Sequence, residues 1–146
     1  MPVSVDDVAA VLEKLPRRLL GGLEGVYLLG GSQRQVVGGR NWGCYYRRRV
    51  FLFAAPRAWL IWRTAEYPGP ELERFRPLRP RIRREGSSWL TEVDERELRD
   101  FYLYDVLLHE VGHHVDFRRN GYRWRSRRKE ERYAEWFAAS YGKRLR

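Results

Sequence analysis

The sequence LHEVGHHVD, residues 108–116, contains all three histidines of this 146-residue chain. On a helix, residues four positions apart lie on one face about one turn from each other, so His109 and His113 can present imidazole nitrogens to one metal ion. Glu110 lies beside that face, where its carboxylate can reach a metal-bound water without binding the metal itself. Two neutral nitrogens, an open coordination position and an adjacent base are what a metal-activated hydrolase requires.

This run lies within a longer helical pattern. From Asp94, which offers a helix start, to about Arg118 no proline interrupts the sequence. Apolar residues wrap more than half of the predicted helix, at Leu98, Phe101, Tyr102, Leu103, Val106, Leu107, Val111 and Val115. Such a helix packs on a sheet on one side and on a partner helix on another. Gly112 costs about 1 kcal/mol relative to alanine, so we expect it to permit close approach of a second backbone.

Residues 126–142 predict the partner helix. Ser126 suits the N-cap and Gly142 suits the C-terminal stop. Glu131 and Glu135 share one face of this helix, while its apolar and small positions are Tyr133, Ala134, Phe137, Ala138 and Tyr141. The two alanines are suitable partners for the glycine of the first helix.

Two histidines alone hold zinc poorly, so we expect a third protein ligand. His114 lies about 100° round the helix from His113, and the chain has no other histidine. The single cysteine, Cys44, lies in an apolar, aromatic stretch without a neighbouring cysteine or histidine. A carboxylate is therefore favoured as the third ligand. Asp105 and Asp116 lie within about 40° of His109 on the helical wheel, and each is either a hydrogen-bond partner of an imidazole or a solvated side chain.

The run HEVGH at residues 109–113, followed by E-x-x-A-E-x-F-A at residues 131–138, resembles the gluzincin metallopeptidases. It is particularly similar to the lethal-factor-like and minimal gluzincin groups, and to the metalloprotease half of phage-repressor-cleaving regulators. The resemblance covers about the last third of the chain. The site that it implies has one Zn²⁺ per chain held by His109, His113 and Glu131, Glu110 as general base, and Glu135 as an acid that orients a ligand histidine.

The resemblance also implies a fold and an activity. The expected fold is α+β and zincin-like: a small, twisted, mostly antiparallel sheet packed on the long helix, in a single domain over residues 1–146. The expected activity is hydrolysis of peptide bonds, with endopeptidase action favoured over exopeptidase action. The tetrahedral oxyanion needs a donor besides the metal. We favour Tyr122 for this role over Tyr133, Tyr141 and the arginines between residues 123 and 128.

The sequence predicts several strands between residues 25 and 62. Residues 25–29, 35–37, 44–46 with 50–53, and 59–62 are rich in β-branched and aromatic residues and are punctuated by glycines. In zincins the edge strand of the sheet lines the cleft, where an extended peptide can add as a further strand. Residues 67–90 contain four prolines and are expected to form an irregular connection.

Composition limits the remaining possibilities. A capped amphipathic helix over residues 4–15 is expected in place of a secretory signal, and the longest apolar runs are too short to span a membrane. One cysteine fits a reducing compartment, so a cytoplasmic protein that does not bind membranes is expected.

The chain is strongly basic. Its net charge is +10, with arginines clustered at residues 47–49, 79–84 and 118–128. These clusters either bind an acidic partner, namely an acidic peptide or protein substrate or a nucleic acid, or form an ordinary solvated face. The alternative to a peptidase is therefore a non-catalytic zinc-binding module with a regulatory or nucleic-acid-associated role.

Overall fold

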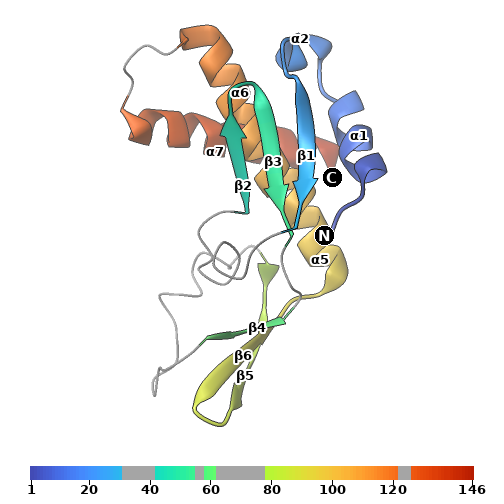
Figure 1. Ribbon diagram of the computed structural model, residues 1–146, viewed down its shortest axis with the longest axis vertical. Coiled ribbons are helices and arrows are strands. Elements are labelled where there is room, and N and C mark those ends of the chain that lie inside the picture. Colours follow the sequence, from blue (N-terminus) through green and yellow to red (C-terminus); the bar gives the residue numbers. More distant parts are fainter. Residues whose placement is uncertain (31–41, 55–57, 62–77, 122–125) are drawn as a thin grey trace.

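The computed structural model describes residues 1–30, 42–54, 58–61, 78–121 and 126–146, and within these the fold is α+β (Figure 1). The helices are α1 (Val5–Glu13), α2 (Arg17–Leu20), α5 (Glu95–Phe101), the π-helical segment η2 (Tyr102–Leu107), α6 (Leu108–Asn120) and α7 (Arg127–Leu145). The strands are β1 (Gly25–Leu29), β2 (Gly43–Tyr46), β3 (Arg49–Phe53), β4 (Ala58–Ile61), β5 (Arg81–Glu85) and β6 (Ser88–Glu92).

The predicted single sheet is two separate three-stranded sheets among the described residues. The first has the order β1-β3-β2, in which β1 pairs with β3 in parallel and β2 pairs with β3 antiparallel. The second has the order β4-β6-β5 and is antiparallel throughout. Figure 1 shows the first sheet lying in front of α6, while the second extends from the opposite end of the molecule. Predicted strand residues 35–37 lie outside the described residues.

The prediction of an irregular connection over residues 67–90 is wrong for its last ten residues. Strands β5 and β6 form a hairpin whose two-residue turn begins at Gly86, with φ +61°. The exposed positions of β5 carry arginines and a glutamate around Ile82. This leaves too few apolar residues for an alternation that would predict a strand.

The long helical pattern is confirmed, with one addition. Asp94 caps it, because its side chain accepts hydrogen bonds from the backbone N–H groups of Arg96 and Glu97. Helical structure then continues from Glu95 to Asn120 through the π-helical segment that directly precedes the HEVGH run. π-Helical turns are rare and occur often at functional sites.

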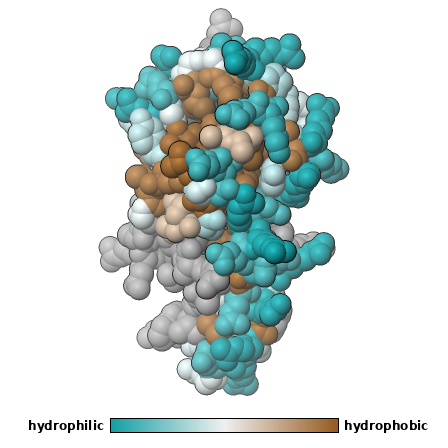
Figure 2. Space-filling model, turned by 90° about the vertical axis from the view of Figure 1, so that its right-hand side faces the viewer, coloured by the Kyte–Doolittle hydropathy of each residue, from teal (hydrophilic) through white to brown (hydrophobic). Residues whose placement is uncertain are grey.

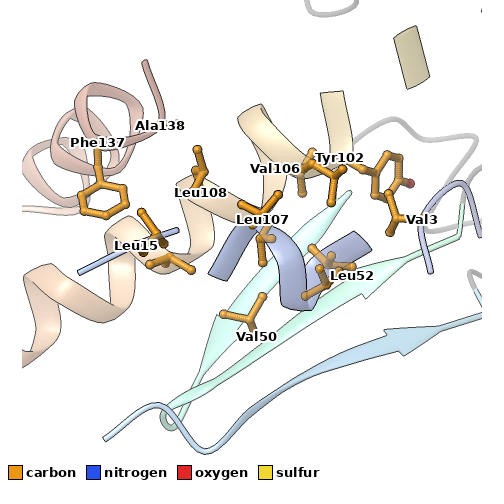
Figure 3. Packing of buried hydrophobic residues seen from close by; sticks show 14 of the residues in the cluster. Val3, Leu15, Val50, Leu52, Tyr102, Val106, Leu107, Leu108, Phe137 and Ala138 are labelled. Carbon is orange, nitrogen blue, oxygen red and sulfur yellow. The ribbon is translucent and has the colours of Figure 1, made fainter. Parts of the chain in front are cut away.

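Between the first sheet and the helices lies the apolar core. Val50 and Leu52 of β3 are fully buried and point toward Val106 and Leu107 (Figure 3). Burying each such aliphatic side chain stabilises the fold by roughly 1.5–3 kcal/mol. Helix α1 has the expected Ser4–Asp7 capping box. None of the described helices is both long and apolar enough to cross a membrane.

Contact between α6 and α7 is close at Gly112. A Cβ atom at this position would lie 2.9 Å from Cα of Ala134 and 3.1 Å from Cβ of Phe137, so the expected close approach is confirmed. Gly142 does not end α7, which continues to Leu145. Its lack of a side chain instead permits contact with the Tyr104 carbonyl, 3.2 Å from where its Cβ would be.

Candidate metal centre

Three side chains converge where α6 meets α7. Nε2 of His113 lies 3.1 Å from Nε2 of His109. Oε2 of Glu131 lies 3.3 Å from Nε2 of His109 and 3.8 Å from Nε2 of His113. Within the described part of the chain, this is a group of three residues whose donor atoms could hold one metal ion.

The helix pairing explains this convergence. His109 and His113 are one turn apart on α6, and Gly112 between them contacts Ala134 of α7. Glu131 lies three residues before Ala134 and therefore projects from the same face of α7, one turn nearer its start. The contact at Gly112 thus sets how far the carboxylate lies from the two imidazoles.

The spacing of the donor atoms is compatible with one tetrahedrally coordinated metal ion. In tetrahedral coordination with bonds of about 2.0–2.1 Å, neighbouring donor atoms lie about 3.3–3.4 Å apart, and the three measured distances of 3.1, 3.3 and 3.8 Å bracket this value. Burial and the neighbouring His109 lower the pKa of His113, which favours the neutral imidazole that a metal requires. All three residues are partly exposed, so solvent and ligands have access to the group.

Glu110 lies beside this triad and is 7% exposed. Burial raises its pKa to about 8, and the negative charge of Glu131 acts in the same direction. The backbone N–H of Tyr45 donates a hydrogen bond to the Glu110 carboxylate and partly opposes this rise in pKa. Strand β2 approaches closely here, since a Cβ atom on Gly43 would lie 2.9 Å from Cγ of Glu110.

The triad opens into a cleft of about 1220 Å³ between β2 and the helices α5 to α7. Trp42 and Phe101 form an edge-to-face pair that contributes apolar surface to its wall. Further residues that line the cleft are Cys44, Tyr45, Asp105, Val106, Arg127, Arg128, Glu130 and Glu135. The cleft is thus lined by both aromatic and charged residues, and it has room for an extended peptide chain.

Asp105 and Asp116, the two candidate hydrogen-bond partners of an imidazole, each contact another side chain. Oδ2 of Asp105 lies 2.6 Å from Nη2 of Arg146, so this cleft residue forms an ion pair with the last residue of the chain. Asp116 is buried and accepts a hydrogen bond of 2.8 Å from Nδ2 of Asn120. Its charge nevertheless acts on His113, whose pKa it raises against the larger effect of burial.

The remaining predicted residues have different placements. Glu135 is exposed and lines the cleft, while Tyr122 lies outside the described residues. The hydroxyl of Tyr133 accepts a hydrogen bond of 3.1 Å from Arg119, and Tyr141 stacks on Phe137. Cys44 is exposed at the cleft but does not belong to the donor triad.

His114, which lies off the helix face shared by His109 and His113, is completely buried. Its Nε2 donates to the carbonyl of Gly21 at 3.2 Å, and its Nδ1 accepts from the hydroxyl of Tyr45 at the same distance. Tyr45 therefore contacts Glu110 through its backbone and His114 through its side chain. No local sequence pattern indicates this role of Tyr45, because its contacts join residues far apart in the chain.

The chain matched no family model, no curated protein and no solved structure.

Proposed function

We propose that this protein is a zinc-dependent metallopeptidase of the gluzincin type. The observation that carries the proposal is the convergence of two imidazoles and one carboxylate on a single point, with a buried glutamate beside them at the wall of an open cleft. Gluzincins use this donor set, and the resemblance in the HEVGH run and in residues 131–138 independently supports it.

The triad His109, His113 and Glu131 would hold the zinc ion. Bound zinc supplies Lewis acidity, which activates water and polarises the carbonyl of a peptide bond. Glu110 accepts the proton of the attacking water and delivers it to the leaving nitrogen. A general base is most effective when its pKa lies near the working pH. Burial raises the pKa of Glu110 toward neutral pH. A cation beside the carboxylate would lower that pKa again.

Strand β2 is the edge of the first sheet nearest to the triad among the described strands. An extended peptide bound along such an edge pairs through its main chain and leaves its side chains to the cleft. Gly43 supports this arrangement, because any larger residue would collide with Glu110.

The test of catalysis is the Glu110→Gln variant. It should retain zinc and lose cleavage of a denatured protein substrate by at least about 100-fold, since a general base contributes about 10²–10⁴-fold. Glu130→Gln is the matched control, because Glu130 also lines the cleft but lies outside the donor triad. Equal cleavage by wild type and Glu110→Gln would refute the catalytic proposal while leaving the metal site intact.

A further inference from the structure

The outer face of the first sheet is a second surface to which the metal centre assigns no role. Val50 and Leu52 of β3 point into the core, so Arg49, Phe51 and Phe53 point away from it because strand side chains alternate. The register then places further side chains on the same outer face. This face, called the outer sheet face below, carries Tyr27, Leu29, Cys44, Tyr46, Phe51 and Phe53.

Large apolar side chains of this face contact solvent. Tyr46 is 56% exposed, Tyr27 is 42% exposed and Leu29 is 40% exposed. The rings of Tyr27 and Phe51 stack with centroids 5.3 Å apart, so the two strands carry one continuous aromatic pair. Figure 2 views the neighbouring side, on which α1 and β1 lie in Figure 1, and hydrophobic residues there lie among hydrophilic ones. Exposed apolar side chains that share one face, as Tyr27 and Leu29 do, mark interaction sites.

Three consecutive arginines border the outer sheet face. Arg47 and Arg48 form the two-residue turn between β2 and β3, and both have positive φ, at 46° and 68°. Hairpins of this kind require positive φ at both turn residues and strongly prefer Asn-Gly there. Arginine is less stable than asparagine or glycine in this conformation. Residues held in such unfavourable backbone conformations are concentrated at functional sites.

Positive charge predominates at this turn. Glu24 pairs with Arg49 at 2.9 Å and approaches Arg48 at 3.8 Å, so these two arginines share one carboxylate. The guanidinium of Arg47 lies 5.2 Å from the ring centroid of Tyr46, on the outer sheet face. The whole chain has a net charge of +10, so the field at this turn attracts anions.

We propose that the outer sheet face binds single-stranded nucleic acid. Exposed rings on a sheet stack on unpaired bases, and adjacent arginines contact the phosphates. The bases of a duplex are stacked on each other and offer no free faces to Tyr27 and Tyr46. An anionic membrane would also attract the arginines, so phosphatidylserine vesicles enter the experiment below as the competing ligand.

The proposed surface is independent of the metal centre, although the two share strand β2. Gly43 and Tyr45 face Glu110 and His114, whereas Tyr46 lies on the outer sheet face. Binding to this surface therefore needs neither zinc nor a working Glu110. The Glu110→Gln variant should bind as wild type does, so the surface and the peptidase proposal stand or fall separately.

The experiment measures fluorescence anisotropy of labelled oligothymidylate and oligouridylate strands, each of about 20 nucleotides, longer than the roughly 4–16 nucleotides of a single small binding face. We expect binding of at least one of the two strands, with affinity that falls as salt rises. Tyr27→Leu and Tyr46→Leu keep an apolar side chain but remove the ring, and each should weaken binding about five-fold or more. Arg47→Asn should also weaken binding while relieving the turn, so a loss of folding does not explain the effect.

Matched controls come from α7. Trp136 is as exposed as Tyr46, at 56%, and Arg144 lies over the Tyr141 ring as Arg47 lies over Tyr46. Trp136→Leu and Arg144→Asn should leave binding unchanged. The proposal is overturned if neither strand binds at low salt, if a duplex of the same length binds equally well, or if the control variants weaken binding as much as the test variants. It is also overturned if phosphatidylserine vesicles displace the strands and bind both leucine variants as tightly as wild type.

Discussion

Tyr45 of β2 forms hydrogen bonds with two buried side chains of α6, Glu110 and His114. It thereby connects the first sheet to the candidate metal centre. Its backbone N–H donates to Glu110, while its hydroxyl donates to Nδ1 of His114. Its ring also packs edge-to-face against the imidazole of His114. The strand is thereby fixed to α6 next to the proposed general base, which keeps the wall of the cleft in place.

Removing the Tyr45 hydroxyl should cost stability without disturbing Glu110. In Tyr45→Phe, the buried Nδ1 of His114 loses its donor, and an unsatisfied buried acceptor costs about 1–3 kcal/mol. Chemical denaturation should show this loss in the free energy of unfolding. The neighbouring exposed Tyr46 provides the control, and Tyr46→Phe should change stability by less than about 0.5 kcal/mol. Equal stabilities of the two variants would contradict the role assigned to Tyr45.

His114 also makes stability depend on pH. Burial lowers its pKa below the ordinary value of 6.5, so the unfolded chain binds a proton more readily than the folded protein. The contribution of His114 to the free energy of unfolding of the metal-free protein should therefore fall as pH drops below about 6.5, while Glu110, whose pKa is raised, contributes with the opposite sign. His113, whose pKa is also lowered, contributes with the same sign as His114. His114→Gln should reduce the slope in denaturation curves measured between pH 7 and 5, and an unchanged slope would show that His114 is not buried as a neutral group.

At the scale of elements, the packing of α6 on α7 positions the third ligand. Gly112 brings the two backbones together directly beside His113, which lies 3.8 Å from Glu131. The helical turn η2 and the close packing of Gly142 on Tyr104 extend the same pairing toward the end of the chain. A change in the distance between these helices should therefore affect metal binding as well as stability.

Gly112→Ala tests this coupling. Its Cβ would lie 2.9 Å from a backbone atom of Ala134, and overpacking of this kind costs about 1–3 kcal/mol. The displaced α7 should carry Glu131 away from the histidines and weaken zinc binding in a competition titration with a chelator. Ala139→Ser, at an exposed position of α7, is the control and should bind zinc as wild type does. If Gly112→Ala binds zinc with wild-type affinity, the contact between α6 and α7 does not control the position of Glu131.

Some of these elements could be predicted from sequence, for identifiable reasons. Long helices repeat their apolar residues with a period of 3.6, and caps such as Ser4 and Asp94 mark their starts. The close contact at Gly112 followed from a glycine in a helix where alanine would be more stable. Strand β5 was missed because arginines occupy its exposed positions, and the turn η2 was missed because no local residue pattern specifies a π-helix.

At the scale of the whole molecule, sequence patterns do not predict contacts between residues far apart in the chain. Parallel pairing of β1 with β3, and the division into two sheets, depend on residues far apart in sequence. The convergence of His109, His113 and Glu131 could be predicted, because the two histidines lie one turn apart and the resemblance implied the glutamate. The ion pair of Asp105 with Arg146 joins residues 41 positions apart, and no helical wheel indicates it.

Zinc should stabilise the folded chain as a whole. A ligand that binds only the folded state at 100 times its dissociation constant adds about 2.7 kcal/mol, which raises Tm by about 5–10 °C for a domain of this size. Thermal denaturation with and without a chelator measures this shift. The shift should disappear in His113→Ala, which removes one of the three ligands.

The most direct test of the account is the zinc content of the purified protein, measured by elemental mass spectrometry beside the Glu131→Ala and Glu130→Ala variants. We predict one zinc ion per chain in wild type and in Glu130→Ala, and far less than one in Glu131→Ala. Wild-type protein that binds no zinc at neutral pH, or Glu131→Ala protein that retains a full equivalent, would contradict the assignment of His109, His113 and Glu131 as a metal centre.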